Sequence, residues 1–418
     1  MYYRETLPNG VRIVAERVEH VPSVSLGIWV GVGSRNEADA QAGISHFIEH
    51  MLFKGTRRRS ARDIAEELDS VGGRMNAFTD KEYTCYYAKV LTEHLPLAFD
   101  LLADMLLEPR LDPDDIECEK NVVIEEIKRH EDTPEDLIHD VLAQNLWADH
   151  PLGRPVLGTL DTVQRFTREQ IRDYMDQWYT ADSIIVAAAG NVDPQELFKL
   201  TERYFGGLNG TAPKLSLHPP KPQICSCYLN RSTEQVHLCV GAPGISHDSE
   251  DRYAMAVLDV AYGGGVSSRL FQEIRESRGL VYSIGSYFAS YREGGLFAVY
   301  AGTSSDTAGE VLRLVEAEEE RLRKEGFSKE EIERAKSQIR GSMLLGLEST
   351  SARMTRLGRL ELYFGRIVPI EEVLAGIDAV TLDDVHRLCT QVLDSGRHTI
   401  AVIGPFDNPP VFSAQPNR

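Results

Sequence analysis

The sequence has few cysteines, and none of them form the CxxC pair that is typical of metal and redox sites. Among 418 residues the six cysteines are Cys85, Cys118, Cys225, Cys227, Cys239 and Cys389. Cys225 and Cys227 stand two residues apart on an expected strand, so their side chains share one face, and we expect free thiols there. Nothing in this pattern indicates an oxidising compartment, which favours a reducing one.

The sequence also lacks a long apolar run and a recognisable export signal. Its most apolar segment, SIIVAAAGNV (183–192), is far too short to cross a bilayer. The N-terminal segment MYYRETLPNGVRIVAERV alternates apolar and polar residues around Pro8-Asn9-Gly10, which predicts a β-hairpin rather than a signal peptide. We therefore expect a cytoplasmic protein that does not associate with a membrane.

Basic residues are outnumbered by acidic ones. The chain has 45 Lys and Arg residues against 64 Asp and Glu residues, which gives a formal net charge of -19 at pH 7. Proteins that bind nucleic acids usually carry a basic patch or stripe, so we expect no nucleic-acid partner. The acidity favours solubility and the attraction of basic partners, but it does not determine the fold.

The clearest change in composition lies near the middle of the chain. The segment GGLNGTAPKLSLHPPKPQ (206–223) is rich in glycine and proline. Because proline does not fit helix or sheet ladders, this segment reads as an extended linker. The sequence therefore predicts an N-terminal domain at 1–208, a linker at 209–223 and a C-terminal domain at 224–418, both domains of ordinary size.

The two halves have the same outline. Each has an apolar strand, helices, a hairpin, long amphipathic helices and a final strand closed by glycine, namely SIIVAAAGNVDP in the first half and HTIAVIGPFDNP in the second. This pattern suggests an internal duplication. Hairpins interleaved with helices predict an α+β fold with two structurally similar domains, each a mainly antiparallel sheet with helices packed on one face.

The segment GISHFIEHMLFKGT (43–56) carries two histidines four residues apart, with a glutamate before the second. Residues i and i+4 of a helix lie on one face, so His46 and His50 can bind the same ion. Glu49 can then reach a water molecule on that ion, and this order of residues is the inverted zincin motif HxxEH. The alternative is a core or surface helix that carries two imidazoles by chance.

A catalytic zinc site needs a third protein ligand, and the helix expected at 113–130 is the place to look. The residues of its apolar stripe are Ile116, Val123 and Ile127. Glu119 and Glu126 lie beside this stripe on the helical wheel, whereas Glu125 points nearly opposite. Carboxylates on a buried edge cost free energy of folding unless a cation compensates their charge. A metal would do so; the alternative is a partly solvated edge with salt bridges to Lys120 or Arg129.

Three segments together, residues 43–56, GGRMNAFTDKEYTCYY and EKNVVIEEI, resemble the pitrilysin/insulin-degrading family of inverted-motif zinc peptidases. The chain length is similar to that of the mitochondrial-processing-peptidase branch, especially its bacterial processing-protease-like members. The resemblance spans nearly the whole chain. It implies that Zn²⁺ is bound by His46, His50 and Glu126, which follows His50 by 76 positions. It also implies that Glu49 is the general base and that Glu119 orients a ligand or the water.

The resemblance implies further residues that act on the substrate. Asn76 and Ala77 are similar to the edge strand on which this family pairs its peptide substrate by β-addition. Arg275 and Tyr282, seven residues apart in the second half, match an Arg and a Tyr that reach the active site, where they bind a substrate carbonyl or carboxylate and stabilise an oxyanion. Read without the resemblance, these residues are an ordinary hairpin strand, a surface charge and a core aromatic.

The function expected from this resemblance is that of a zinc metalloendopeptidase. It would hydrolyse peptides or unfolded, presequence-like segments inside a chamber enclosed by four domains of a dimer. A homodimer is the expected assembly, and a heterodimer with a related subunit is the alternative. The second functional hypothesis is a non-catalytic scaffold or a partner-dependent subunit of a processing-peptidase complex. The complete set of motif residues favours the enzyme.

Overall fold

The computed structural model describes residues 1–405, apart from the side chain of residue 395, and forms two compact units. Unit 1 consists of residues 1–128, 154–216 and 346–367. Unit 2 consists of residues 129–153, 217–345 and the described residues from 368 onward. Residues 406–418 of the predicted C-terminal domain, including the end of the segment HTIAVIGPFDNP, lie outside the described residues.

Unit 1 is built on a six-stranded sheet with the strand order β1-β2-β6-β3-β5-β4. Its strands are β1 (Tyr2–Thr6), β2 (Arg12–Arg17), β3 (Ser23–Val30), β4 (Arg74–Thr79), β5 (Thr84–Leu91) and β6 (Ile184–Gly190). All neighbours are antiparallel except β2 and β6. The N-terminal hairpin predicted around Pro8-Asn9-Gly10 is confirmed, because β1 pairs with β2 and Gly10 turns the chain with a φ of 103°.

Both faces of this sheet are apolar, so both need a covering layer. On β3, Val24, Leu26 and Ile28 point into the larger core, and Trp29 points to the opposite face. The helices of unit 1 are α1 (Ile44–Leu52), α2 (Ala61–Asp69), α3 (Leu95–Leu107), most of α4 (Pro113–Glu131), α6 (Leu160–Gln164), α7 (Arg168–Trp178), α8 (Pro194–Phe205) and α12 (Thr350–Phe364).

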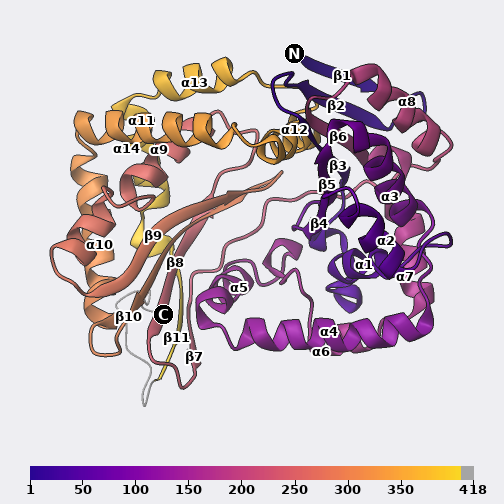
Figure 1. The fold of residues 1–418 in the computed structure, drawn as a ribbon. Helices are drawn as coiled ribbons and strands as arrows, with labels where there is room; N and C mark the ends of the chain where they lie inside the picture. The colour runs from indigo at the N-terminus through magenta and orange to yellow at the C-terminus, as the bar shows by residue number, and fades with distance from the viewer. Residues whose placement is uncertain (406–418) are drawn as a thin grey trace. The chain divides into compact units, whose positions relative to one another are not determined.

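Helix α12 covers the Trp29 face, although it lies far from the rest of unit 1 in the sequence. Figure 1 shows it in orange beside the indigo strands β2 and β3, and it also packs against β6. The Trp29 indole N–H donates to the sulfur of Met354 at 3.4 Å. Gly358 lets the helix approach closely, because a Cβ there would lie 2.2 Å from the Trp29 ring. The long-range packing of this face thus decides where α12 belongs.

Unit 2 repeats the topology of unit 1. Its strands are β7 (Ser226–Asn230), β8 (Val236–Gly244), β9 (Val281–Ser290), β10 (Gly295–Thr303) and β11 (Thr399–Gly404). They have the order β7-β11-β8-β10-β9, with β7 and β11 parallel and the other neighbours antiparallel. This order corresponds strand by strand to β2-β6-β3-β5-β4, so the predicted α+β fold with two similar halves is confirmed.

The helices of unit 2 are α5 (Pro134–Leu146), α9 (Arg252–Tyr262), α10 (Ala308–Glu325), α11 (Lys329–Gly346), α13 (Ile370–Ala379) and α14 (Leu382–Val392). Most of them pack on one face of the sheet. Helix α5 packs on the other face, where Leu142 contacts Gly241 of β8 and where Leu146 and Trp147 are buried. Each sheet therefore has a main helical layer, as predicted, and one further helix on its opposite face.

The compact units differ from the continuous ranges 1–208 and 224–418 expected from the sequence. Helix α5 comes from the first range but belongs to unit 2, and α12 comes from the second but belongs to unit 1. The residues expected as a linker, 209–223, form neither helix nor strand. The difference arises because the amphipathic pattern of a helix predicts that it will be covered, but not which sheet will cover it.

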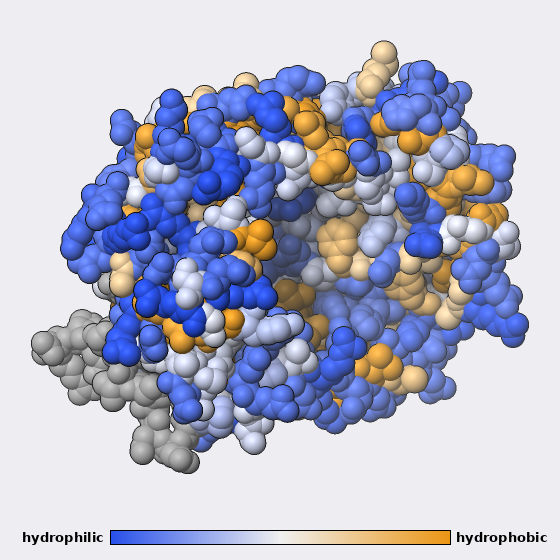
Figure 2. Space-filling model, turned by 60° about the vertical axis from the view of Figure 1, so that its left-hand side comes forward, coloured by the Kyte–Doolittle hydropathy of each residue, from blue (hydrophilic) through white to orange (hydrophobic). Residues whose placement is uncertain are grey.

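The visible surface of the protein is mostly hydrophilic (Figure 2), and the helices of the described residues are not those of a membrane-spanning segment. Hydrophilic residues occupy most of the face shown in Figure 2. Within residues 1–405, every helix falls short of the length or the apolar content needed to span a lipid bilayer.

Candidate metal centre

Helix α1 presents the HxxEH motif from a rigid starting point. Gly43 precedes the helix with a φ of 91°, and a Cβ at this position would lie 2.6 Å from the carbonyl oxygen of Leu157. The buried Glu37 accepts hydrogen bonds from the backbone N–H groups of Gly43 and Ser45 at 2.8 and 2.9 Å. These bonds satisfy donors at the first turn of the helix, so Glu37 holds the helix start in place.

Helix α4 brings the third predicted ligand to the two histidines. The Oε2 atom of Glu126 lies 3.4 Å from Nε2 of His50 and 3.8 Å from Nε2 of His46. One ligand atom from each of these three residues lies within 4.8 Å of the others. Glu125 is exposed and pairs with Lys128 at 2.7 Å, as expected for the opposite side of the helix. The structure thus brings together the residues that the sequence predicted as a ligand set.

The geometry and chemistry of these groups fit a zinc ion. Ligand atoms at about 2.0–2.2 Å from a tetrahedral zinc are separated by roughly 3.4 Å, close to the distances between Glu126 and the histidines. Two imidazoles and one carboxylate leave the fourth position open, as catalytic zinc sites require. His46 is buried, its Nδ1 atom has no hydrogen-bond partner within the described residues, and its Nε2 is directed at Glu126. A bound cation would stabilise this imidazole.

The protein surroundings act oppositely on the two histidines. Burial, followed by the neighbouring His50, lowers the pKa of His46 to about 4 and keeps this ring neutral, the form that binds metals. Burial also opposes the charge on His50, but Glu119 and Glu126 outweigh it and raise the pKa of His50 to about 9. A proton and a metal ion therefore compete for His50.

Glu119 contacts His50 rather than the common point of the three ligands. Nδ1 of His50 donates to Oε1 of Glu119 at 2.8 Å, which directs Nε2 of His50 toward Glu126. The other carboxylate oxygen of Glu119 forms an ion pair with Lys54. The alternative read from the sequence was an edge with salt bridges to Lys120 or Arg129; in the structure the salt bridge of Glu119 is to Lys54, and Lys120 pairs with Glu117 at 2.6 Å.

Two contacts in this centre were missed by the sequence reasoning. Lys54 follows His50 by four residues, a spacing that places it next to His50 on a helical path and so near Glu119, the partner of His50. Thr79, the last residue of β4, donates from its hydroxyl to Oε2 of Glu49 at 2.6 Å. Alternate residues of a strand point to the same face, so the sequence could have placed Thr79 on the same face of the strand as Ala77. Burial raises the pKa of Glu49, and the Thr79 hydroxyl opposes this shift.

The predicted substrate residues lie in different parts of the chain. Asn76 and Ala77 belong to β4, which is an edge strand of its sheet and pairs with β5. Arg275 lies in the π-helical turn Phe271–Glu276 of unit 2, and Tyr282 lies in β9. The reading of Tyr282 as a core aromatic is wrong, because Tyr282 is 75% exposed. The guanidinium of Arg275 lies 5.9 Å from the centre of its ring.

Two family profiles match successive segments of the chain. The profile of the insulinase family, peptidase family M16, matches residues 12–160. A second profile of this family, described as the peptidase M16 inactive domain, matches residues 165–339. The chain belongs to peptidase family M16. The resemblance seen in the sequence is therefore confirmed, and the metal-centre residues on α1 and α4 fall within the first matched segment.

Relatives of this M16 chain match it over nearly its full length. The uncharacterized zinc protease YmxG of Bacillus subtilis is 42% identical over 410 residues, which cover 98% of this chain and 100% of the relative. An uncharacterized zinc protease of Streptomyces coelicolor is 44% identical over 411 residues, covering 96% of this chain and 89% of the relative.

Two solved structures share the fold of the M16 chain. A crystal structure of a peptidase M16 inactive domain from Pseudomonas fluorescens superposes with a TM-score of 0.91 at 20% identity, over 97% of this chain and 98% of that one. The crystal structure of a protease from Helicobacter pylori superposes with a TM-score of 0.89 at 22% identity, over 97% of this chain and 100% of that one. At these identities the likeness concerns the fold alone.

Proposed function

We propose that this M16 chain is a zinc-dependent metalloendopeptidase. The observation that carries the proposal is that ligand atoms of His46, His50 and Glu126 lie within 4.8 Å of one another. Glu49 lies on α1, the helix that carries both histidines. The relatives named as zinc proteases support the choice of metal. When bound, zinc would polarise the scissile carbonyl and make a neighbouring water acidic.

The chain's own residues divide the remaining work. Glu49 accepts the proton of the attacking water and delivers it to the leaving amine. Its carboxylate is held by the Thr79 hydroxyl at 2.6 Å, so its orientation does not depend on substrate. Glu119 and Lys54 hold the ring of His50, so that its Nε2 remains available for the metal.

The substrate we propose is an extended peptide or an unfolded, presequence-like segment. The open edge of β4, which carries Asn76 and Ala77, can receive such a segment as an added strand. We assign to Arg275 the binding of a substrate carbonyl or carboxylate, and to Tyr282 the stabilisation of the oxyanion. The family resemblance also supports a homodimer that encloses a chamber, with a heterodimer as the alternative, and a cytoplasmic location.

The test of this proposal combines metal analysis with hydrolysis of a quenched fluorescent peptide. We expect one zinc ion per chain, cleavage of the peptide, loss of cleavage with a chelator and recovery on adding zinc. A chain that binds zinc but cleaves no peptide would instead support the non-catalytic scaffold or a subunit that needs a partner. A folded chain that binds no zinc would overturn the proposal.

Replacing Thr79 tests whether the orientation of Glu49 matters. Thr79→Val removes the hydroxyl but keeps the shape of the side chain, and we expect turnover to fall about 10–100-fold with zinc content unchanged. Thr79→Ser keeps a hydroxyl and should recover most of the turnover. Equal turnover in the valine and serine variants would mean that this hydrogen bond has no part in catalysis.

A further inference from the structure

A groove runs along the open edge of β4 and includes a cavity of about 770 Å³. One of its sides is apolar and is formed by Phe53, Ile64 and Leu68 together with Met75 of β4. Phe53 and Met75 pack against the larger core of unit 1, on the face of the sheet that α1 and α2 cover. Strand β4 connects the groove with the metal centre, since Arg74, Met75 and Asn76 line the groove and Thr79 at the end of the same strand contacts Glu49.

The other side of the groove is basic. Alternate residues of a strand point to opposite faces, so Arg74 and Asn76 lie on the face opposite Met75. Arg74 stands directly across from Lys89 of β5 in the antiparallel register. Both side chains line the groove and are exposed, and Ser351 of α12 lines the same side.

Arg74 and Lys89 form an uncompensated pair of positive charges. Like charges directly opposite on neighbouring strands destabilise each other. Within residues 1–405, neither side chain forms an ion pair or a hydrogen bond, although the chain has 64 acidic residues. Asp69 also lines the groove, but it pairs with neither of them. The two unpaired positive charges can therefore form an ion pair with an anionic group of a ligand.

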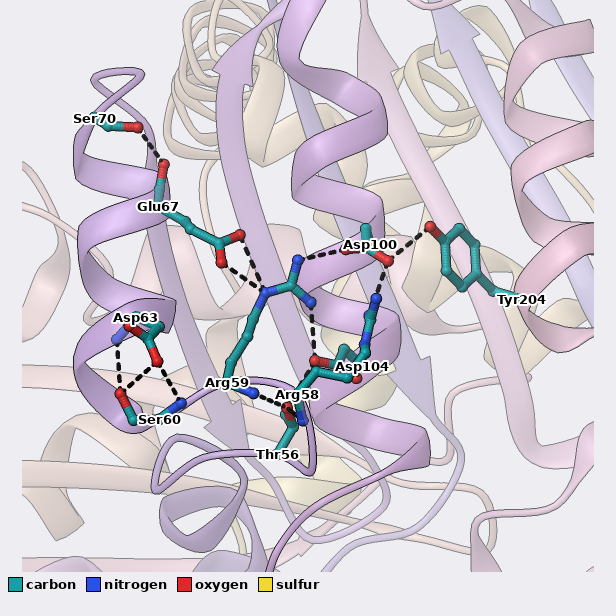
Figure 3. Close-up of polar contacts among 10 residues, drawn as sticks. All are labelled: Thr56, Arg58, Arg59, Ser60, Asp63, Glu67, Ser70, Asp100, Asp104 and Tyr204. Carbon is teal, nitrogen blue, oxygen red and sulfur yellow. Dashed lines mark hydrogen bonds and ion pairs between the residues drawn. The ribbon is translucent and has the colours of Figure 1, made fainter.

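The apolar wall of the groove is held in place before any ligand arrives. Figure 3 shows Arg59 bridging helices α2 and α3, with hydrogen bonds to Glu67 at 2.9 Å, Asp100 at 2.5 Å and Asp104 at 2.9 Å. Burial raises the pKa of Asp100, but its partners, among them Arg58 and Arg59, outweigh burial and lower this pKa to about 2. These charged contacts therefore keep α2 against α3, so the shape of the groove does not have to be created by the substrate.

We propose that this groove selects substrates with a carboxylate-bearing residue next to an apolar one. The inference rests on the proposed peptidase function and deepens it. A peptide strand added to β4 points its side chains alternately to the two faces, so one side chain enters the apolar side while its neighbour meets Arg74 and Lys89. Arg74 precedes Thr79 by five residues, or about 17 Å along a strand, so the selected residue lies about five positions from the scissile bond.

The test uses a series of quenched fluorescent peptides that differ at one position. Each carries Glu, Gln or Lys at one site about three to seven residues from the scissile bond, on either side, with an apolar neighbour. We expect one position at which kcat/KM for the Glu peptide exceeds that for the Lys peptide by about three- to ten-fold. The ratio should shrink in about 0.5 M salt, because the contacts are exposed.

Charge reversal provides the decisive comparison. In Arg74→Glu/Lys89→Glu the preference should invert toward the Lys peptide, and the single variants Arg74→Gln and Lys89→Gln should reduce it. Lys199→Glu is the matched control. Lys199 is exposed on α8, which packs against β2 and not against β4, so the ratio should stay at the wild-type value.

The outcomes separate this inference from the proposed function. Equal cleavage of the Glu, Gln and Lys peptides at every position would overturn the selection of carboxylates and leave the peptidase intact. If no peptide in the series is cleaved, the peptidase proposal fails. Binding of the same peptides to the zinc-loaded chain, measured by fluorescence anisotropy, then decides whether the groove still prefers the carboxylate.

Discussion

We expect Glu49→Gln to abolish nearly all peptide hydrolysis and to leave zinc bound. The amide keeps the shape of the side chain and its hydrogen bond with the Thr79 hydroxyl, but it cannot accept the proton of the attacking water. General acid–base catalysis contributes about 10²–10⁴-fold, so we expect turnover to fall by roughly 10³-fold. Steady-state hydrolysis of a quenched peptide measures the turnover, and elemental analysis measures zinc per chain.

Retention of zinc in Glu49→Gln is as important as the loss of turnover. Within residues 1–405, the metal-binding group identified from ligand positions contains His46, His50 and Glu126 but not Glu49. Glu66→Gln is the control, because Glu66 is an exposed glutamate on α2 that pairs with Arg62. Loss of zinc together with activity in Glu49→Gln would show that the roles of base and ligand have been assigned wrongly.

We expect Glu126→Gln to lose zinc affinity while the fold remains intact. The substitution replaces an anionic ligand by a weaker neutral one and leaves two imidazoles to hold the ion. Loss of a residue that only orients a ligand costs about 10–100-fold in affinity, and we expect the loss of this direct ligand to cost roughly 10³-fold. Competition with a fluorescent zinc chelator gives the dissociation constant, and far-UV circular dichroism checks the fold.

Two further glutamates on α4 make this experiment specific. Glu125→Gln changes the adjacent residue, which is exposed and paired with Lys128, and should leave zinc affinity unchanged. Glu119→Gln weakens the contact with His50 and should reduce affinity less than Glu126→Gln does. If Glu126→Gln keeps full affinity and Glu119→Gln loses it, then Glu119 is the ligand.

The local pattern of the sequence predicted the parts of the centre that depend on a single helix. The spacing of His46 and His50 places both on one face of α1, whatever surrounds the helix. On α4, the stripe that contains Ile116 and Val123 was correctly expected to face inward, and Glu119 is buried beside it. Periodicity alone left the choice between Glu119 and Glu126 open, because both lie on the same edge of the helix.

The contacts that refine this centre come from several elements and were not read from the sequence. Thr79 reaches Glu49 from a strand 30 positions downstream, and Lys54 reaches Glu119 on another helix. Spacing within one helix or strand can indicate the face on which Lys54 or Thr79 lies, but their pairing with Glu119 and Glu49 depends on how strands and helices pack. The same holds for Arg74 and Lys89, whose opposition follows from the register of β4 and β5.

The sequence by itself determined that the chain is an α+β duplication with an HxxEH helix and an acidic partner helix. Hydrophobic periodicity encodes each element and its buried face, and this information is local. Only the tertiary structure decided that α5 and α12 each cover a sheet whose strands come from the other half of the chain. It also decided that Tyr282 is exposed. The physical reason is that an apolar helix face is stabilised by any matching apolar surface, so the choice of surface is settled by packing among residues far apart in the sequence.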